Sequence, residues 1–150
     1  MGPPLKTLRQ TTAEQTRELR KRRGMTQQDL ADRLNHLGAQ IDRTAVAKIE
    51  AGRRELGLSE LFAFALALDV APVNLLVPID SDEPIRLAPN LEAPPHEVRA
   101  WIRGFMPLFQ DPRVYFTTVP KTEFQAADGA LAEWLRTSRI QVTTEPEDES

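Results

Sequence analysis

Four side chains in one short segment have the chemistry needed to recognise the edges of DNA bases. In the segment 43–50, RTAVAKIE, Val46 and Ile49 have the spacing of one apolar helical face. The remaining positions then expose Arg43, Thr44, Ala47 and Lys48. An arginine can bond a guanine edge twice, a lysine can reach a guanine or a phosphate, and the methyl groups of alanine and threonine suit thymine. A solvated helix face that binds nothing is the alternative.

Capping and stop signals predict the helices that position this segment. Thr12-Ala-Glu-Gln15 has the form of a capping box, and Thr26-Gln-Gln-Asp29 repeats the signal, with stops at Gly24 and Gly38. Asp42 predicts the start of a third helix that ends at Gly52. A fourth helix is expected from about Ser59 to Leu68, and a fifth from Pro72 through Leu76. The sequence therefore predicts five short helices in fewer than 80 residues.

The charges are divided unevenly along the chain, whose net charge is -3. Residues 1–57 contain 12 Lys/Arg and 7 Asp/Glu, a net charge of +5. Residues 58–150 contain 7 Lys/Arg and 15 Asp/Glu, a net charge of -8. A basic first part favours a polyanionic partner at that end only, although charges can also segregate by chance.

The composition argues against several other classes of protein. The chain has no cysteine, which excludes disulfides and thiolate metal sites and favours a reducing compartment. His36 and His96 lie far apart in the sequence, and no nucleophile–base pair or glycine-rich phosphate loop is present. The longest apolar run, Leu61–Leu68, is too short to cross a bilayer, and the start has no signal-peptide pattern. We therefore expect a cytoplasmic protein with no catalytic residues, metal, cofactor or membrane partner.

Several stretches follow the order and spacing of a known family. They are Leu19-Arg20, Gly24-Met-Thr-Gln27, Asp29-Leu-Ala31, the run from Arg43 to Arg54, and Leu61 to Val70. From Arg20 to Leu76, a little over a third of the chain, the sequence resembles the XRE family, whose domain is a lambda-repressor/Cro-like helix-turn-helix. The resemblance implies a mainly α fold with a five-helix DNA-binding domain. It also implies a homodimeric transcriptional regulator, most often a repressor, that binds double-stranded DNA sequence-specifically.

The resemblance assigns roles to further residues. Gln27, in the first turn of the second helix, corresponds to a position that clamps backbone phosphate, where free N–H groups and the positive helix end attract anions. Arg53 and Arg54 match a basic pair that grips phosphate beside the groove, and a solvated loop is the alternative. Arg20 and Glu50 match an ion pair that holds the recognition helix, which is the helix predicted over residues 43–50, against the first helix.

One connection departs from the family pattern. Asn35–Gln40 lie between Leu34 and Ile41, which is longer than the usual turn between the second and third helices. Leu37 falls on the apolar face and Gly38 follows it, so we expect the second helix to gain a turn.

The second half of the chain is expected to be separate. The domains predicted are 1–77 for DNA binding, 78–95 as a linker rich in proline and acid, 96–140 as a small C-terminal region, and 141–150 as a disordered acidic tail. The C-terminal region is predicted to be mostly helical with minor β: helices near Val98–Ile102 and over Phe124–Arg136, and a strand over Val114–Val119. A brief strand is expected at Ile85–Leu87.

The function of the C-terminal region stays open. Residues 96–140 contain both tryptophans, the only tyrosine and four of the six phenylalanines, enough for a small core or an interface. This region could form the homodimer or bind a protein partner or a small-molecule effector. Two alternatives remain for the whole protein: an antitoxin that controls its own operon, and a protein-interaction adaptor that does not bind DNA.

Overall fold

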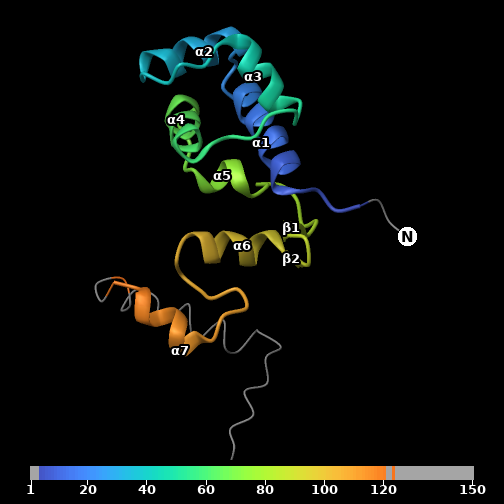
Figure 1. Ribbon diagram of the computed structural model, residues 1–150, viewed down its shortest axis with the longest axis vertical. Helices are drawn as coiled ribbons and strands as arrows, with labels where there is room; N and C mark the ends of the chain where they lie inside the picture. The colour runs from blue at the N-terminus through green and yellow to red at the C-terminus, as the bar shows by residue number, and fades with distance from the viewer. Residues whose placement is uncertain (1–3, 121–122, 124–150) are drawn as a thin grey trace, which may run out of the picture. The chain divides into compact units, whose positions relative to one another are not determined.

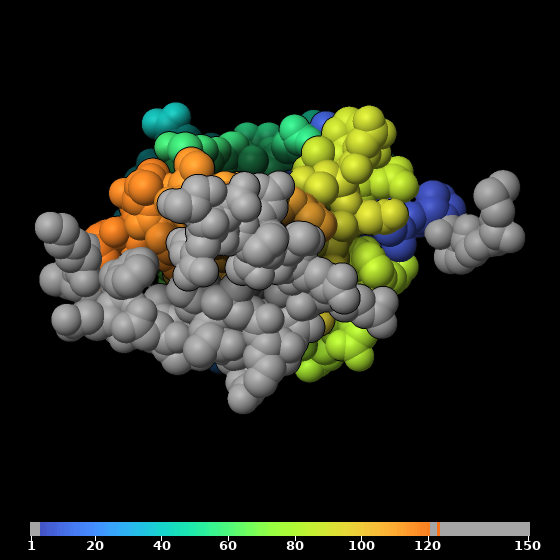
Figure 2. Space-filling view, turned by 90° about the horizontal axis from the view of Figure 1, so that it is seen from below, coloured from blue at the N-terminus to red at the C-terminus, as the bar shows by residue number. Residues whose placement is uncertain are grey.

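The computed structural model describes residues 4–120 and 123, and the other residues are drawn in grey in Figure 1 and Figure 2. The contacts divide the chain into two units, 1–102 and 103–150. The described residues form seven α-helices and one two-stranded sheet, so the expected mainly α fold with minor β is confirmed. No helix in this part of the chain is long and apolar enough to span a lipid bilayer.

The five helices expected in the first half are present (Figure 1): α1 (Leu8–Arg22), α2 (Gln27–His36), α3 (Arg43–Glu50), α4 (Leu58–Leu68) and α5 (Val73–Leu76). The cap of α1 was predicted at Thr12, five residues too late. The Thr7 hydroxyl accepts the Gln10 N–H, and the Gln10 side chain accepts the Thr7 N–H, so an earlier capping box begins the helix. Thr12 is instead buried inside α1.

The caps of α2 and α3 form at the predicted residues. The Thr26 hydroxyl accepts the Asp29 N–H (3.0 Å), and the Asp29 carboxylate accepts the Thr26 N–H (2.8 Å). These bonds to Thr26 hold the pKa of the Asp29 carboxyl below its ordinary value. At α3, the Asp42 carboxylate accepts the Ala45 N–H (2.7 Å). The recognition segment thus begins at a fixed residue.

The core of the first unit lies between these helices. Its fully buried side chains come from four of them: Leu30, Leu34, Val46, Ile49, Phe64, Leu68 and Leu75. Each contributes about 1.5–3 kcal/mol by leaving water. Leu37, predicted on the apolar face, is 49% exposed, because it follows the end of α2, where Gly38 (φ +84°) turns the chain.

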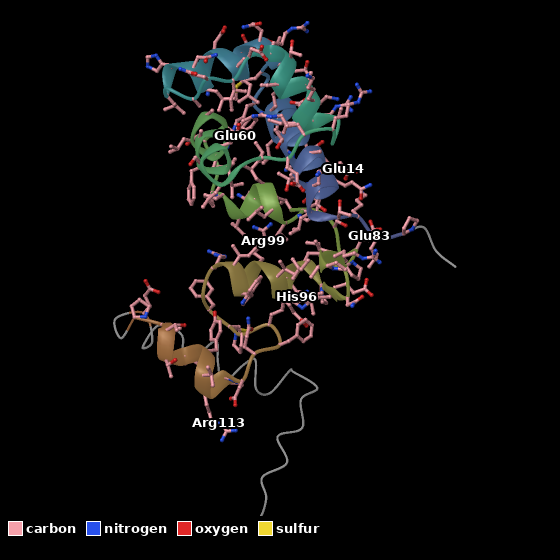
Figure 3. The ribbon with its side chains drawn as sticks, viewed as in Figure 1. Glu14, Glu60, Glu83, His96, Arg99 and Arg113 are labelled. Carbon is pink, nitrogen blue, oxygen red and sulfur yellow. The ribbon has the colours of Figure 1, made fainter. Side chains whose placement is uncertain are left out.

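Residues 78–95 were expected as a linker, but they contain a β-hairpin. Strands β1 (Ile85–Ala88) and β2 (Leu91–Ala93) form an antiparallel hairpin in which Ile85 pairs with Ala93, and both residues are buried. Helix α6 (Pro95–Ile102) follows, and its Arg99 donates to the Asn74 side chain (2.6 Å) and the Val77 carbonyl (3.0 Å), between α5 and α6 in Figure 3. Apolar burial and these bonds extend the first unit to residue 102, beyond the expected boundary at 77.

The described residues of the second unit include one wrong prediction. Val114–Val119 were expected as a strand, but α7 (Pro112–Tyr115) and a 3₁₀ turn (Phe116–Thr118) occupy this region. The Asp111 carboxylate accepts the Arg113 N–H, and Pro112 suits a first helical turn, so local capping outweighs β propensity. The helix predicted over Phe124–Arg136 and the tail 141–150 lie outside the described residues.

Candidate nucleic-acid interface

Helix α3 buries one face and leaves a mixed cationic and polar face open. Val46 and Ile49 are 0% and 1% exposed. On the other side Arg43, Thr44 and Lys48 are exposed, whereas Ala47 is half-buried. Among the described residues, neither Arg43 nor Lys48 has an ion-pair partner. Both cations are therefore available to a ligand that approaches this face.

A buried ion pair fixes the orientation of α3. Arg20 donates through Nε and Nη2 to the two carboxylate oxygens of Glu50, at 2.5 and 2.9 Å. The side chains are 11% and 4% exposed, so this pair lies largely out of water. Arg20 Nη1 also donates to the Met25 carbonyl at 2.7 Å, in the turn between α1 and α2. The bond to Glu50 raises the pKa of Arg20, while burial opposes that shift.

Gln27 joins this cluster instead of pointing freely outward. Its Nε2 donates to Glu50 Oε2 at 3.0 Å, so Glu50 links α3 to both α1 and α2. The resemblance implies a phosphate contact for Gln27, and the bond to Glu50 uses one of the two N–H groups of this amide. A phosphate near this position would meet the backbone N–H groups of the first turn of α2. The two bonds from Arg20 and the one from Gln27 hold Glu50, and with it helix α3, in one orientation.

The long connection between α2 and α3 is held by a residue that sequence analysis missed. The Asn35 side-chain nitrogen donates to the carbonyls of Ala31 and Ile41, both at 2.9 Å. The Ala39 N–H donates to the Leu34 carbonyl at 3.0 Å, and Ile41 is buried. The additional residues thus form a bonded turn that returns the chain to the core. An asparagine in the last turn of a helix, before His-Leu-Gly, was the available signal.

The two arginines after α3 differ in their surroundings. Arg53 is exposed. Arg54 Nη2 donates to Glu60 Oε1 at 2.5 Å, and Arg54 Nη1 is buried without a hydrogen-bond partner among the described residues. Glu60 also accepts the Gly57 N–H at 2.9 Å and so caps α4 (Figure 3 labels Glu60 there). The resemblance implies the same role for both arginines, but of the two only Arg54 has an ion-pair partner among the described residues.

Comparison with known proteins identifies the domain. A family model described as "Helix-turn-helix" matches residues 17–75, which include every residue of the site. The chain belongs to the XRE-type helix-turn-helix family. This is a family of DNA-binding transcription regulators and not an enzyme family.

Two solved structures are similar to this helix-turn-helix chain. The restriction-modification controller protein C.AhdI from Aeromonas hydrophila is 32% identical, with 44% of this chain and 88% of that chain covered and a TM-score of 0.40. The hypothetical transcription factor NHTF from Neisseria is also 32% identical, with 53% and 88% covered and a TM-score of 0.44. No curated protein sequence matches the chain.

Proposed function

We propose that this XRE-type regulator binds operator DNA sequence-specifically as a homodimer and acts as a repressor. The observation that carries the proposal is the fixed orientation of α3. The buried pair of Arg20 and Glu50 holds its inner face, and the outer face keeps Arg43 and Lys48 unpaired among the described residues. A helix anchored on one side and cationic on the other suits the major groove.

Some residues of this interface would contact bases, and others would contact phosphates. Arg43, at the start of α3, would read a guanine edge with two hydrogen bonds, and the methyl groups of Thr44 and Ala47 would contact thymine. Lys48 would reach a guanine or a phosphate. Arg53, exposed beyond the end of α3, would hold phosphate together with the first turn of α2. Arg54 contributes less directly, because Glu60 already binds its guanidinium.

The symmetry and the position of operators support the homodimer and the repressor role. One α3 reads only a short half-site, so two copies related by two-fold symmetry would gain affinity on a palindromic operator. A regulator bound over a promoter would then exclude the polymerase. A protein that binds operators must be in the same compartment as the DNA. For bacterial-type operators this compartment is the cytoplasm, so we place the proposed function there.

DNA selection followed by salt-dependent binding tests the proposal. Sites selected from a random duplex library should share one palindromic preference, and affinity for them should fall steeply from low to moderate salt. Arg53→Ala should reduce the salt slope by about one unit on specific and random duplex alike. Arg113→Ala is the matched control, since Arg113 is 92% exposed in the second unit and its loss changes the net charge equally. A slope near zero for the unmodified protein would refute the proposal.

A further inference from the structure

A cavity of about 250 Å³ lies in the first unit, beside the chain 51–57 that joins α3 to α4. Four half-buried leucines from four parts of the chain line it: Leu8, Leu56, Leu61 and Leu76. Helix α1, which supplies Leu8, begins beside α5, which supplies Leu76 (Figure 1). Ile49, on the inner face of α3, also lines the cavity. We call this space the leucine cavity.

One cationic side chain at the wall of the leucine cavity has an unused hydrogen-bond donor. Arg54 lines the cavity, and its Nη2 donates to Glu60. The Arg54 side chain is 39% exposed, yet its Nη1 is buried and has no acceptor in the part of the chain that the structure describes. Nη1 therefore lies on the inward side of the guanidinium. A buried donor without an acceptor is unfavourable, so an acceptor placed near Nη1 would be stabilising.

The charges and the size of the leucine cavity restrict what it can hold. Arg9 and Glu55 also line it and lie 3.2 Å apart, so each of the two arginines at the wall already has a carboxylate partner. A charged ligand would therefore find no uncompensated charge. At roughly 30 Å³ for each water-sized group, the cavity has space for about eight such groups, which is a small molecule and not a nucleotide.

We propose that the leucine cavity binds a small neutral aliphatic molecule that ends in a carbonyl oxygen. The aliphatic part would pack against the four leucines and be removed from water. A small turn of the guanidinium would let Arg54 Nη1 donate to the carbonyl oxygen while Nη2 stays near Glu60. A molecule that offers only donors would leave Nη1 without an acceptor. This inference goes beyond the proposed function, because such binding does not require DNA.

The position of the leucine cavity connects it to the DNA-binding face. Arg54 directly follows Arg53, which we propose as a phosphate contact, and Leu56 lies two residues further along. A ligand that packs on Leu56 and bonds Arg54 would hold this segment in one conformation, so Arg53 would lose less freedom when DNA binds. The ligand should then tighten DNA binding, and DNA should tighten ligand binding by the same factor. This effect on DNA rests on the proposed function.

Nuclear magnetic resonance of the full-length chain with labelled leucine methyl groups tests the site directly. The probe is heptan-2-one, a neutral ketone of the expected size. It should shift the methyl signals of Leu56, Leu61 and Leu76 saturably, with a dissociation constant on the order of 1 mM. The signals of Leu91, 37% exposed on β2, should not move. Heptylammonium has as many non-hydrogen atoms but only donors, so it should bind at least about fivefold more weakly.

Two variants test the two halves of the site. Arg54→Lys keeps a cation that can pair with Glu60 but removes the second nitrogen, so ketone affinity should fall at least about fivefold. Leu8→Trp fills the cavity and should abolish the saturable shifts. Leu91→Trp is the matched control and should bind the ketone as wild type does. Circular dichroism melting checks that the tryptophan variants are folded, and Arg54→Lys gives a test that does not fill the core.

Fluorescence anisotropy on the selected operator measures the coupling. A saturating concentration of heptan-2-one should raise the affinity of the wild-type chain about fivefold and should leave Arg54→Lys unchanged. Four results would overturn the inference: no saturable shifts at the cavity leucines, equal binding of the ketone and the ammonium, ketone binding unaffected by both Arg54→Lys and Leu8→Trp, or an operator affinity that the bound ketone does not raise. A chain that binds the ketone but no DNA would instead refute operator binding and leave the ligand site standing.

Discussion

The carboxylate of Glu50 accepts three hydrogen bonds while its side chain is only 4% exposed, and Glu50→Ala removes all three. Two come from Arg20 and one from Gln27. After truncation, the guanidinium of Arg20 keeps its bond to the Met25 carbonyl but lies buried without a counter-ion. Arginine stays protonated at any accessible pH, so the charge cannot be relieved by losing a proton.

Removing one partner of a buried ion pair costs about 3–5 kcal/mol. We expect a loss of about 3 kcal/mol in the free energy of unfolding, because the Met25 carbonyl still accepts a hydrogen bond from the guanidinium. Urea denaturation at neutral pH, followed by far-ultraviolet circular dichroism, measures the change. Glu50→Gln keeps the shape and one acceptor oxygen, so it should fall between wild type and Glu50→Ala.

The chain offers a matched control in an exposed pair. Glu55 lies 3.2 Å from Arg9, with side chains 66% and 47% exposed, so Glu55→Ala should cost no more than about 1 kcal/mol. An apolar replacement of both buried partners, Arg20→Met with Glu50→Leu, should recover most of the lost stability. If Glu50→Ala and Glu55→Ala were equally destabilising, burial would not govern the strength of the Arg20–Glu50 pair, and the reasoning would fail.

Three further outcomes are expected. Arg43→Ala should cost about 1–3 kcal/mol on the selected operator and relax preference at one base pair; an equal loss on random duplex would make Arg43 a phosphate contact. The lowered pKa of Asp29 means that its stabilising contribution is present above 3.8, its ordinary value, and is lost as the pH falls through the lower folded-state pKa. Acid titrations of wild type and Asp29→Asn should therefore differ in stability at neutral pH and converge at low pH, and a constant difference would contradict this. Limited proteolysis should release a fragment that extends past residue 102, since 85–93 form a hairpin; rapid cleavage within 78–95 would instead support a linker there.

Short sequence patterns correctly predicted the helix starts that are fixed by hydrogen bonds between neighbouring residues. The cap at Thr26 and the cap at Asp42 are short-range hydrogen bonds between residues three apart, so the sequence specifies them directly. The start of α1 was missed because Thr7 and Thr12 both precede a glutamine by three residues. Only the structure shows that the earlier pair forms the capping box.

Contacts between distant residues were beyond the reach of these signals. Nothing local to Arg54 indicates that Glu60 binds it, and nothing local to Gln27 indicates that its amide meets Glu50. Residues 78–95 were predicted as a linker from their proline and acid content, but Ile85 is buried and strand β1 contacts helix α1. Over Val114–Val119 the side chains favour a strand, but the cap at Asp111 starts a helix there instead. A prediction from side-chain preference alone does not include this cap.

The hairpin also has a consequence for the order of folding. The Arg86 N–H donates to the Lys6 carbonyl at 3.4 Å, so strand β1 meets the residues just before α1. Contacts among α1, α2 and α3 close short loops, whereas this contact closes nearly the whole first unit and carries a larger entropic cost. We therefore expect the helices to assemble first and the hairpin to dock late. Contacts absent from the transition state slow unfolding without speeding folding, so the hairpin would set the kinetic lifetime of the DNA-binding unit.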